Sequence, residues 1–265
     1  MYFRFIMRFQ PFQLFLILLS GVVLLFIIGP LLGMFISTTP YQLFETSKDP
    51  EVQRSIGLTL WVSMAATLVF ALGGIPLAYL LARKDFALKK VILGIIDLPI
   101  VIPHSAAGIA VLGFISRETV VGKMGSAIGL DFVGAPAGIA IAMGFVSIPF
   151  LVNAARDGFL AVPVRYEQAA LTLGASPIRV FFTISLPLAW RNIVSGLILM
   201  FARGMSEFGA VIIIAYHPMV APVLIWERFS SFGLSYARPV AVLFILVSLV
   251  FFIGLRFLSR TKKDA

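Results

Sequence analysis

Long uncharged apolar segments dominate this sequence and restrict it to folds that suit a lipid bilayer. Residues 12–37 and 55–82 contain no Asp, Glu, Lys or Arg. A helix that crosses the hydrocarbon core needs about 20 predominantly apolar residues, and both segments exceed that length. Charged residues make up only 12% of the chain, whereas a soluble domain carries about a quarter. The chain is therefore predicted to be an all-α integral membrane protein.

Six predominantly apolar segments, three of which contain charged residues, occur along the chain, which is expected to form a single transmembrane domain over residues 1–265. The expected spans are 12–37, 55–82, 91–116, 132–155, 188–215 and 239–258. Pro99 and Pro103 lie within the third span, and a proline inside a helix removes a hydrogen bond and bends or breaks it. The third span is thus predicted to be kinked or broken.

Basic residues are unevenly distributed over the segments that connect these spans. Six spans place both termini on one side of the membrane, and short cytoplasmic segments carry an excess of Lys and Arg. Counted with the termini inside, the cytoplasmic side holds fourteen basic residues, namely Arg4, Arg8, Arg83, Lys84, Lys89, Lys90, Arg156, Arg165, Arg179, Arg191, Arg256, Arg260, Lys262 and Lys263. The other side holds six, namely Lys48, Arg54, Arg117, Lys123, Arg228 and Arg238. Both termini are therefore predicted to be cytoplasmic, and the net charge of +9 reflects topology and anionic lipid rather than nucleic-acid binding.

Residues 163–187 interrupt the apolar pattern between the fourth and fifth spans. Pro163 suits the first position of a helix, and Gly174 suits a C-terminal cap, where a positive φ is needed. Ser176 and Pro177 form an N-cap and first-turn pair for a second short helix. The segment is predicted to be a rigid cytoplasmic hairpin, which is either a docking element for another protein or an amphipathic anchor at the membrane surface.

The same segment resembles the EAA loop of ABC-importer permeases, which reads Glu-Ala-Ala, three residues, Gly, and later Ile-x-Leu-Pro. Alignment on Gly174 matches Ala169 and Ala170 to the two alanines. The glutamate position falls on Gln168, directly after Glu167, so either residue is a candidate for contact with the ATPase. The resemblance implies that this loop is a coupling helix seated in a cytoplasmic ATPase subunit. The candidate coupling residues are Glu167, Gln168, Ala169, Ala170, Gly174, Ala175, Ser176 and Pro177.

Three further segments, 97–112, 201–215 and 215–229, are similar to permeases of molybdate, tungstate and sulfate importers. The last two are most similar to the molybdate/tungstate permeases of archaea. The resemblance implies a type I ABC importer permease fold in the cell membrane, a homodimer, two cytoplasmic ATPase subunits and an external oxyanion-binding protein. It also implies that this chain binds no cofactor and that ATP and Mg are bound by the ATPase subunits. Consistent with this, Gly122-Lys123 is followed by methionine, so no phosphate-binding loop is formed there.

A charged pair is expected near the middle of the fifth span. Arg203 lies roughly 22 Å along that helix at 1.5 Å per residue, and Glu207 lies one turn further on the same face. A charge at this depth costs at least ~2.5 kcal/mol on insertion scales, so Arg203 must face protein or water. Arg203 is interpreted either as neutralised by Glu207, with Asp97 as an alternative partner, or as lining a pathway for a dianion, with Ser206 beside it.

Two other groups of polar residues allow a structural and a functional interpretation. His104 and Ser105 follow the expected break in the third span and either line the pathway or pack within the bundle. The external segment 217–238 contains an amphipathic run with Trp226, whose ring also suits an interfacial membrane anchor. The candidate contacts with the binding protein are Trp226, Glu227 and Arg228.

Enzymatic and metal-binding functions are disfavoured. The two histidines are too far apart in the sequence to form a close metal-binding pair, and no G-x-S-x-G nucleophile motif occurs. No catalytic and no metal residues are therefore expected. The alternatives to a molybdate/tungstate permease are a permease for sulfate or another oxyanion, a secondary transporter or channel that works alone, and, more remotely, an intramembrane enzyme.

Overall fold

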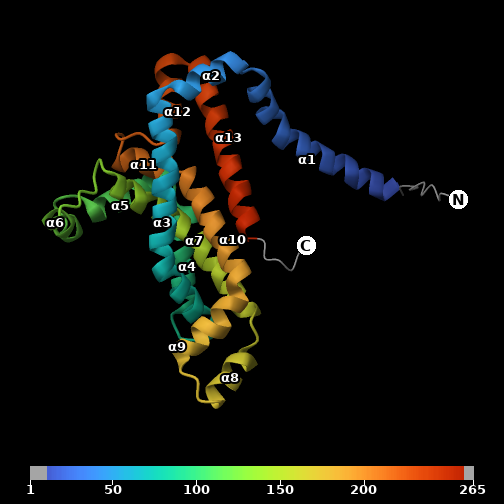
Figure 1. The fold of residues 1–265 in the computed structure, drawn as a ribbon, viewed down its shortest axis with the longest axis vertical. Coiled ribbons are helices and arrows are strands. Elements are labelled where there is room, and N and C mark those ends of the chain that lie inside the picture. Colours follow the sequence, from blue (N-terminus) through green and yellow to red (C-terminus); the bar gives the residue numbers. More distant parts are fainter. Residues whose placement is uncertain (1–10, 260–265) are drawn as a thin grey trace.

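The computed structural model describes residues 11–259, and all of its regular secondary structure is helical (Figure 1). The helices are α1 (Pro11–Ile36), α2 (Pro40–Lys48), α3 (Pro50–Arg83), α4 (Lys89–Val101), α5 (His104–Ile115), α6 (Val120–Ala127), α7 (Pro136–Ala161), α8 (Val164–Thr172), α9 (Pro177–Val180), the π-helix η1 (Phe181–Ser185), α10 (Leu186–Met205), α11 (Gly209–Ile214), α12 (Ala221–Phe232) and α13 (Leu234–Ser259). The all-α prediction is confirmed. Five of the residues counted for the orientation, Arg4, Arg8, Arg260, Lys262 and Lys263, lie outside the described residues.

Within residues 11–259, five helical segments are long and apolar enough to cross a membrane. They are α1, α3, the run Pro177–Met205, α7 and α13. Helices α4 and α5 form a sixth candidate if they are taken as one span, because they are separated by a short break and bent by 115°. Pro103 lies at this break as the residue before α5, which agrees with its inability to continue the hydrogen-bond ladder of α4.

Four expected spans differ from the helices in their extent. Helix α3 begins at Pro50 rather than at residue 55, and α7 covers Pro136–Ala161 rather than 132–155. The segment 188–215 is not one helix, because α10 ends at Met205 and α11 begins at Gly209. The carboxylate of Glu207 accepts the backbone N–H of Ala210 at 2.8 Å and so starts the second helix. The segment 239–258 begins earlier, at Leu234, and Pro239 lies inside α13, where its missing N–H removes one hydrogen bond from the helix.

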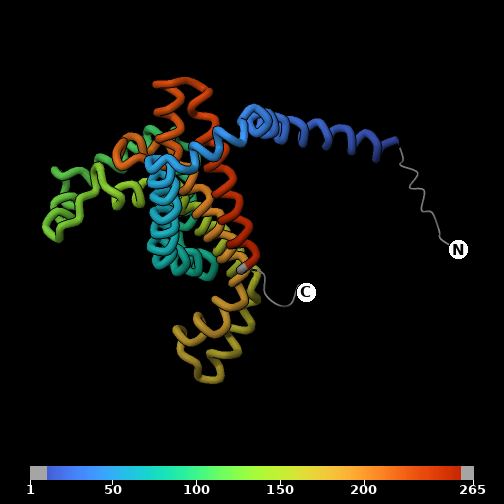
Figure 2. The backbone as a smooth tube through the Cα atoms, turned by 45° about the horizontal axis from the view of Figure 1, so that its top comes forward, coloured from blue at the N-terminus to red at the C-terminus, as the bar shows by residue number. Residues whose placement is uncertain are grey.

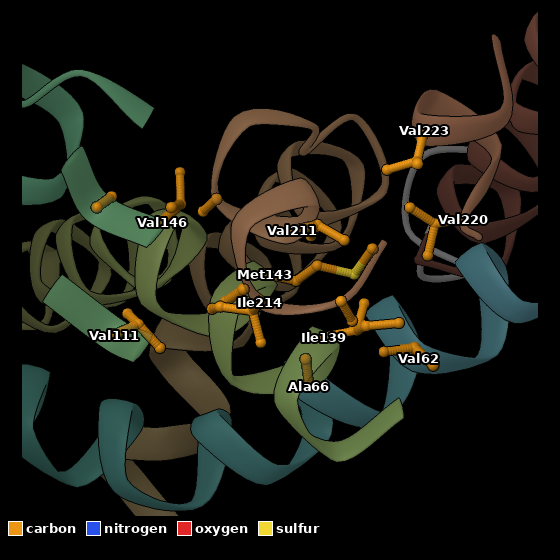
Figure 3. Packing of buried hydrophobic residues seen from close by; sticks show 14 of the residues in the cluster. Val62, Ala66, Val111, Ile139, Met143, Val146, Val211, Ile214, Val220 and Val223 are labelled. Carbon is orange, nitrogen blue, oxygen red and sulfur yellow. The ribbon is translucent and has the colours of Figure 1, made fainter. Parts of the chain in front are cut away.

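Helix α7 is the centre of the bundle and packs against α3 and α10 along most of its length. Its residue Met143 lies in a buried apolar cluster with Val62 of α3, Val111 of α5 and Ile214 of α11 (Figure 3). Within lipid, helices associate through close packing rather than through the hydrophobic effect, and small residues permit that approach. Gly108 of α5 illustrates this, since a Cβ there would lie 2.9 Å from the backbone of α11.

The bundle has two ends of different character. Helices α2 and α12 lie at one end, and α8 and α9 form a hairpin at the other (Figure 1). Helix α1 extends away from the bundle, and none of its residues is buried (Figure 2). Its apolar side chains are therefore free for lipid or for another membrane helix.

Candidate functional site

Residues 163–187 form the predicted hairpin, which consists of α8, α9 and η1. Pro163 is the N-cap of α8 rather than its first residue, so the helix begins one residue later than expected. Gly174 has a φ of +85°, and the N–H of the next residue donates to the carbonyl of Ala170 at 3.0 Å. The hydroxyl of Ser176 accepts the N–H of Arg179 at 3.3 Å and caps α9. A backbone cap at Gly174 and a side-chain cap at Ser176 thus fix the turn between α8 and α9.

The two residues at the motif's glutamate position face in opposite directions. Glu167 is 6% exposed, and its Oε1 accepts Nε of Arg83 at 2.9 Å and the hydroxyl of Ser185 at 2.8 Å. Nη2 of Arg83 also lies 2.8 Å from this oxygen. Gln168 is exposed. Glu167 therefore belongs to the interior of the permease, whereas Gln168 and the adjacent Ala169 lie on the surface of the hairpin.

An apolar patch covers the tip of the hairpin. Leu173, the C-cap of α8, is 88% exposed, and Ile178 of α9 is 72% exposed. Helices α8 and α9 lie at the end of the bundle that is remote from α12 (Figure 1). Arg165 and Arg179 of the same two helices are also exposed. Large apolar side chains that are this exposed suit a protein-docking surface.

A second polar cluster joins the starts of α5 and α11 to the end of α10. Glu207 is 1% exposed, and its Oε2 accepts Nη2 of Arg203 at 2.9 Å and lies 2.8 Å from Nδ1 of His104. Nη2 of Arg203 also lies 2.9 and 3.0 Å from the two ring nitrogens of His104. Neutralisation of Arg203 by Glu207 is thus present in the structure.

Asp97 is not a partner of Arg203, contrary to the alternative considered from the sequence. Its Oδ1 instead accepts Nδ2 of Asn153 of α7 at 2.7 Å. The bend between α4 and α5 explains the difference, because Asp97 lies before the bend and His104 after it. Only the residue after the bend reaches the end of α10.

The same cluster is accessible on its cationic side. The side chains of His104 and Arg203 are 43% and 24% exposed, and Ser105 and Ser206 are exposed. Nη1 of Arg203 donates to the hydroxyl of Ser206 at 3.3 Å. The carboxylate is therefore buried next to a guanidinium and an imidazole that are partly exposed, with the Ser206 hydroxyl on the guanidinium and Ser105 exposed next to His104 in the sequence.

Helix α12 is held to the N-terminal end of α3 by Arg228. Its guanidinium lies 2.6 Å from Oδ2 of Asp49 and 3.0 Å from Oε2 of Glu51. Burial alone would raise the pKa of Asp49, but hydrogen bonds from Arg228 and from the backbone N–H of Glu51 outweigh it, and the pKa lies below its ordinary value. Of the three expected external contacts, Arg228 is thus engaged within the chain, whereas Trp226 is 45% exposed and Glu227 is half-buried.

A hollow of about 780 Å³ opens beside this ion pair. It is lined by the N-terminal part of α3, by the preceding Asp49, and by residues 217–219 of the loop between α11 and α12. The lining includes Asp49, Glu51, Arg54, Ser55, Trp61 and His217. Within the described residues no group of three or more His, Asp or Glu side chains has a geometry that could hold a metal ion.

Several residues of these networks were not predicted from the sequence. Arg83 entered only the count of basic residues, and Asn153, Ser185, Asp49 and Glu51 were not singled out at all. Tyr79, whose hydroxyl lies 3.4 Å from Oε2 of Glu167, was not singled out either. Ser185 lies within the Ile-Ser-Leu-Pro ending, which was the one local signal that pointed to it. No spacing connects Arg83 with Glu167 or Asn153 with Asp97, because each pair is formed by helices that are distant in sequence.

The fold and these sites define a class of membrane transport protein. Residues 74–264 match the family described as "Binding-protein-dependent transport system inner membrane component", and the chain belongs to this family of ABC transporter permeases. It is thus a multi-pass membrane component and not the ATPase. This confirms the family inferred from the EAA loop.

Comparisons with individual proteins narrow this class. The chain is 43% identical to the molybdate/tungstate transport system permease protein WtpB of Methanocaldococcus jannaschii over 96% of this chain and 99% of that one. It is 45% identical to the protein of the same name from Pyrococcus abyssi over 84% of each chain. A sulfate transport system permease protein CysT of Synechococcus elongatus is 30% identical over 83% of this chain and 82% of that one.

Solved structures show the same fold. A bacterial ABC transporter for the import of alginate superposes with a TM-score of 0.73 over 95% of this chain and 96% of the matched chain, at 20% identity. The MetNI methionine ABC transporter in an inward-facing conformation gives a TM-score of 0.61 over 78% and 92%, at 16% identity. The helical arrangement is thus that of ABC importer permeases.

Proposed function

We propose that this chain is the permease subunit of an ATP-driven importer that carries molybdate or tungstate across the cell membrane. The observation that carries the proposal is the identity of 43–45% to molybdate/tungstate permeases over most of both chains. Sulfate permeases are matched at 26–30%. Sulfate is a tetrahedral dianion of the same charge, so it remains the principal rival substrate.

The assembly that we propose is a homodimer of this single-domain permease with two ATPase subunits and an external binding protein. The fold is of the type I importer class, and both termini lie in the cytoplasm with the hairpin. ATP and Mg are bound by the ATPase subunits, and this chain holds no cofactor. The basic residues of the cytoplasmic segments support this orientation.

In this proposal the hairpin docks into the ATPase through its exposed surface. The apolar tip formed by Leu173 and Ile178 supplies the contact area, and Gln168 and Ala169 lie on the side that is free to meet the partner. Glu167 does not make this contact, because its carboxylate is buried and already occupied by Arg83 and Ser185. Closure of the ATPases then moves the hairpin and switches the spans between inward-facing and outward-facing states.

The cluster of His104, Arg203 and Glu207 is proposed as a transient site on the pathway. The exposed edge of Arg203 and the hydroxyl groups of Ser105 and Ser206 attract an oxyanion. Glu207 neutralises much of the guanidinium charge and keeps this attraction weak. Weak attraction suits conduction, because an ion that binds tightly is not released.

The outer end of the bundle is proposed to meet the loaded binding protein. The exposed Trp226 and the half-buried Glu227 of α12 provide the contact, and Arg228 keeps this helix in place against α3. The hollow lined by Arg54 and His217 lies at the same end of α3, beside Asp49 and Glu51.

Reconstitution tests the proposal and separates it from its rivals. The chain is placed in liposomes with its ATPase and binding protein, and ATP hydrolysis and uptake are measured with molybdate, tungstate and sulfate. Stimulation by molybdate- or tungstate-loaded binding protein, with little response to sulfate, is the expected result. Preferential stimulation by sulfate would identify the sulfate rival, and flux in liposomes without the ATPase would identify a stand-alone transporter.

A further inference from the structure

Glu167 has an environment that is unusual for a residue of a surface hairpin. It lies on α8, most of whose residues are exposed, yet its side chain is only 8% exposed. Its Oε1 receives three donor atoms, Nε and Nη2 of Arg83 and the hydroxyl of Ser185. The hydroxyl of Tyr79 lies 3.4 Å from Oε2. The carboxylate is thus satisfied entirely from within the permease.

Arg83 connects three elements through this contact. It belongs to the last turn of α3, and its Nη2 also donates to the carbonyl of Val162 at the end of α7 at 3.0 Å. Its side chain is 9% exposed. A guanidinium that is held at two nitrogens has a fixed direction as well as a fixed distance. The end of α3, the end of α7 and the hairpin are therefore joined through one side chain.

The π-helix η1 positions Ser185, the third donor to the carboxylate of Glu167. Ser185 is the last residue of η1 and is fully buried, and single π-turns are frequent at functional sites. Phe181, at the other end of η1, packs edge-on against Tyr79 with ring centroids 4.9 Å apart. The turn that leads from the hairpin into α10 is thus also anchored to α3.

Helix α3 carries this anchor to the opposite end of the bundle. It is one helix of 34 residues, about 51 Å long at 1.5 Å per residue. Arg228 of α12 pairs with Glu51 in the first turn of α3 and with Asp49, the N-cap residue of α3. The same helix is therefore clamped by ion pairs to the hairpin at one end and to α12 at the other.

We propose that the ion pair between Arg83 and Glu167 is a positioning device that transfers displacement of the hairpin to α3 during transport. This inference rests on the proposed coupling role of the hairpin. A buried ion pair is a weak source of net stability, because desolvation of both charges offsets their attraction. Its directional geometry is better suited to keep two elements moving together. Glu167 acts through Arg83 and touches neither the oxyanion nor the ATPase.

The test measures coupling rather than activity alone. Glu167→Gln removes the charge and keeps the shape, and Asp85→Asn is the control, because Asp85 forms an exposed ion pair with Lys89 just beyond α3. Each variant is reconstituted with the ATPase and loaded binding protein, and ions transported are divided by ATP hydrolysed. We expect this ratio to fall about 10-fold in Glu167→Gln, within the usual range of coupling between sites, and to stay unchanged in Asp85→Asn.

A merely structural role gives a different result. Loss of folded complex lowers uptake and ATP hydrolysis together and leaves their ratio unchanged, which would overturn the proposal. If the Glu167→Gln complex does not assemble, the same ratio is measured for Ser185→Ala. This variant removes one donor to the carboxylate of Glu167 without leaving an unpaired charge. A smaller fall in the ratio supports the proposal, and an unchanged ratio refutes it. A wild-type complex without ATP-dependent uptake would instead refute the proposed function.

Discussion

Gly174 is the residue of the hairpin at which a substitution acts through the backbone alone. Its φ is +85°, and a Cβ at this position would meet no atom within 4 Å. The cost of a side chain is therefore conformational, about 1–2 kcal/mol for an L-residue in the left-handed region. A β-branched residue is disfavoured most strongly in this region, whereas Asn tolerates it. Gly174→Val should thus impair the cap, and Gly174→Asn should largely preserve it.

This strain is not absorbed by the rest of the hairpin. Helix α8 has only 9 residues, and isolated helices shorter than about 12 residues are marginal in water. A cost of one to two kcal/mol corresponds to a factor of about 5 to 30 in the ratio of the capped to the uncapped state. We therefore expect ATP-dependent uptake by Gly174→Val to fall by up to this factor, with normal membrane insertion.

Gly129 supplies the matched control for this prediction. It has a φ of +75°, is exposed and likewise has open space where a Cβ would lie, but it lies far from the hairpin, after α6. Uptake in reconstituted liposomes and the amount of assembled complex are measured for Gly174→Val, Gly174→Asn and Gly129→Val. Equal uptake by the two Gly174 variants, or an equal loss in Gly129→Val, would refute the reasoning.

Three further predictions concern packing and charge. Glu207→Gln leaves Arg203 without its buried counter-charge and should lower stability by about 2–3 kcal/mol, less than for a fully buried pair because the guanidinium is partly exposed; an unchanged unfolding temperature in detergent would contradict this. Gly108→Leu drives a side chain into the backbone of α11 and should cost about 1–3 kcal/mol or more, whereas Gly113→Leu on the same helix meets open space and should leave the unfolding temperature near the wild-type value. Asp49 has a lowered pKa, so its stabilising contribution is present above its ordinary value of 3.8 and is lost as the pH falls through the lowered value. Asp49→Asn should therefore be less stable than the wild type at neutral pH, and the difference should narrow below pH 3.8, which unfolding curves at several pH values can check.

Local patterns were sufficient for much of the fold. The apolar segments gave the number of candidate spans because the bilayer imposes a minimum helix length on every span. Pro103 marked the break between α4 and α5, and Gly174, Ser176 and Pro177 marked the turns of the hairpin. Each of these signals lies within a few residues of the feature that it specifies. The EAA pattern was also local, and it was sufficient to identify the family.

The break within the fifth span was not predicted, although its cause lies nearby. Hydropathy continues from α10 into α11, and the interruption depends on Glu207, whose carboxylate takes a backbone N–H of the next helix. A glutamate that caps a helix in this way has the same sequence context as one that pairs with Arg203 on a continuous helix. Here it does both.

The sequence by itself determined that this chain is a helical membrane permease with a rigid EAA hairpin, because span length, helix caps and the family motif are all encoded over short stretches. Only the tertiary structure decided which polar residues meet. It turned Glu167 inward to Arg83 and left Gln168 at the surface. In the tertiary structure Asp97 accepts a hydrogen bond from Asn153, and Glu207 contacts Arg203 and His104. These choices follow from how α3, α4, α7 and α10 pack, and helices far apart in the sequence leave no local pattern of their contacts.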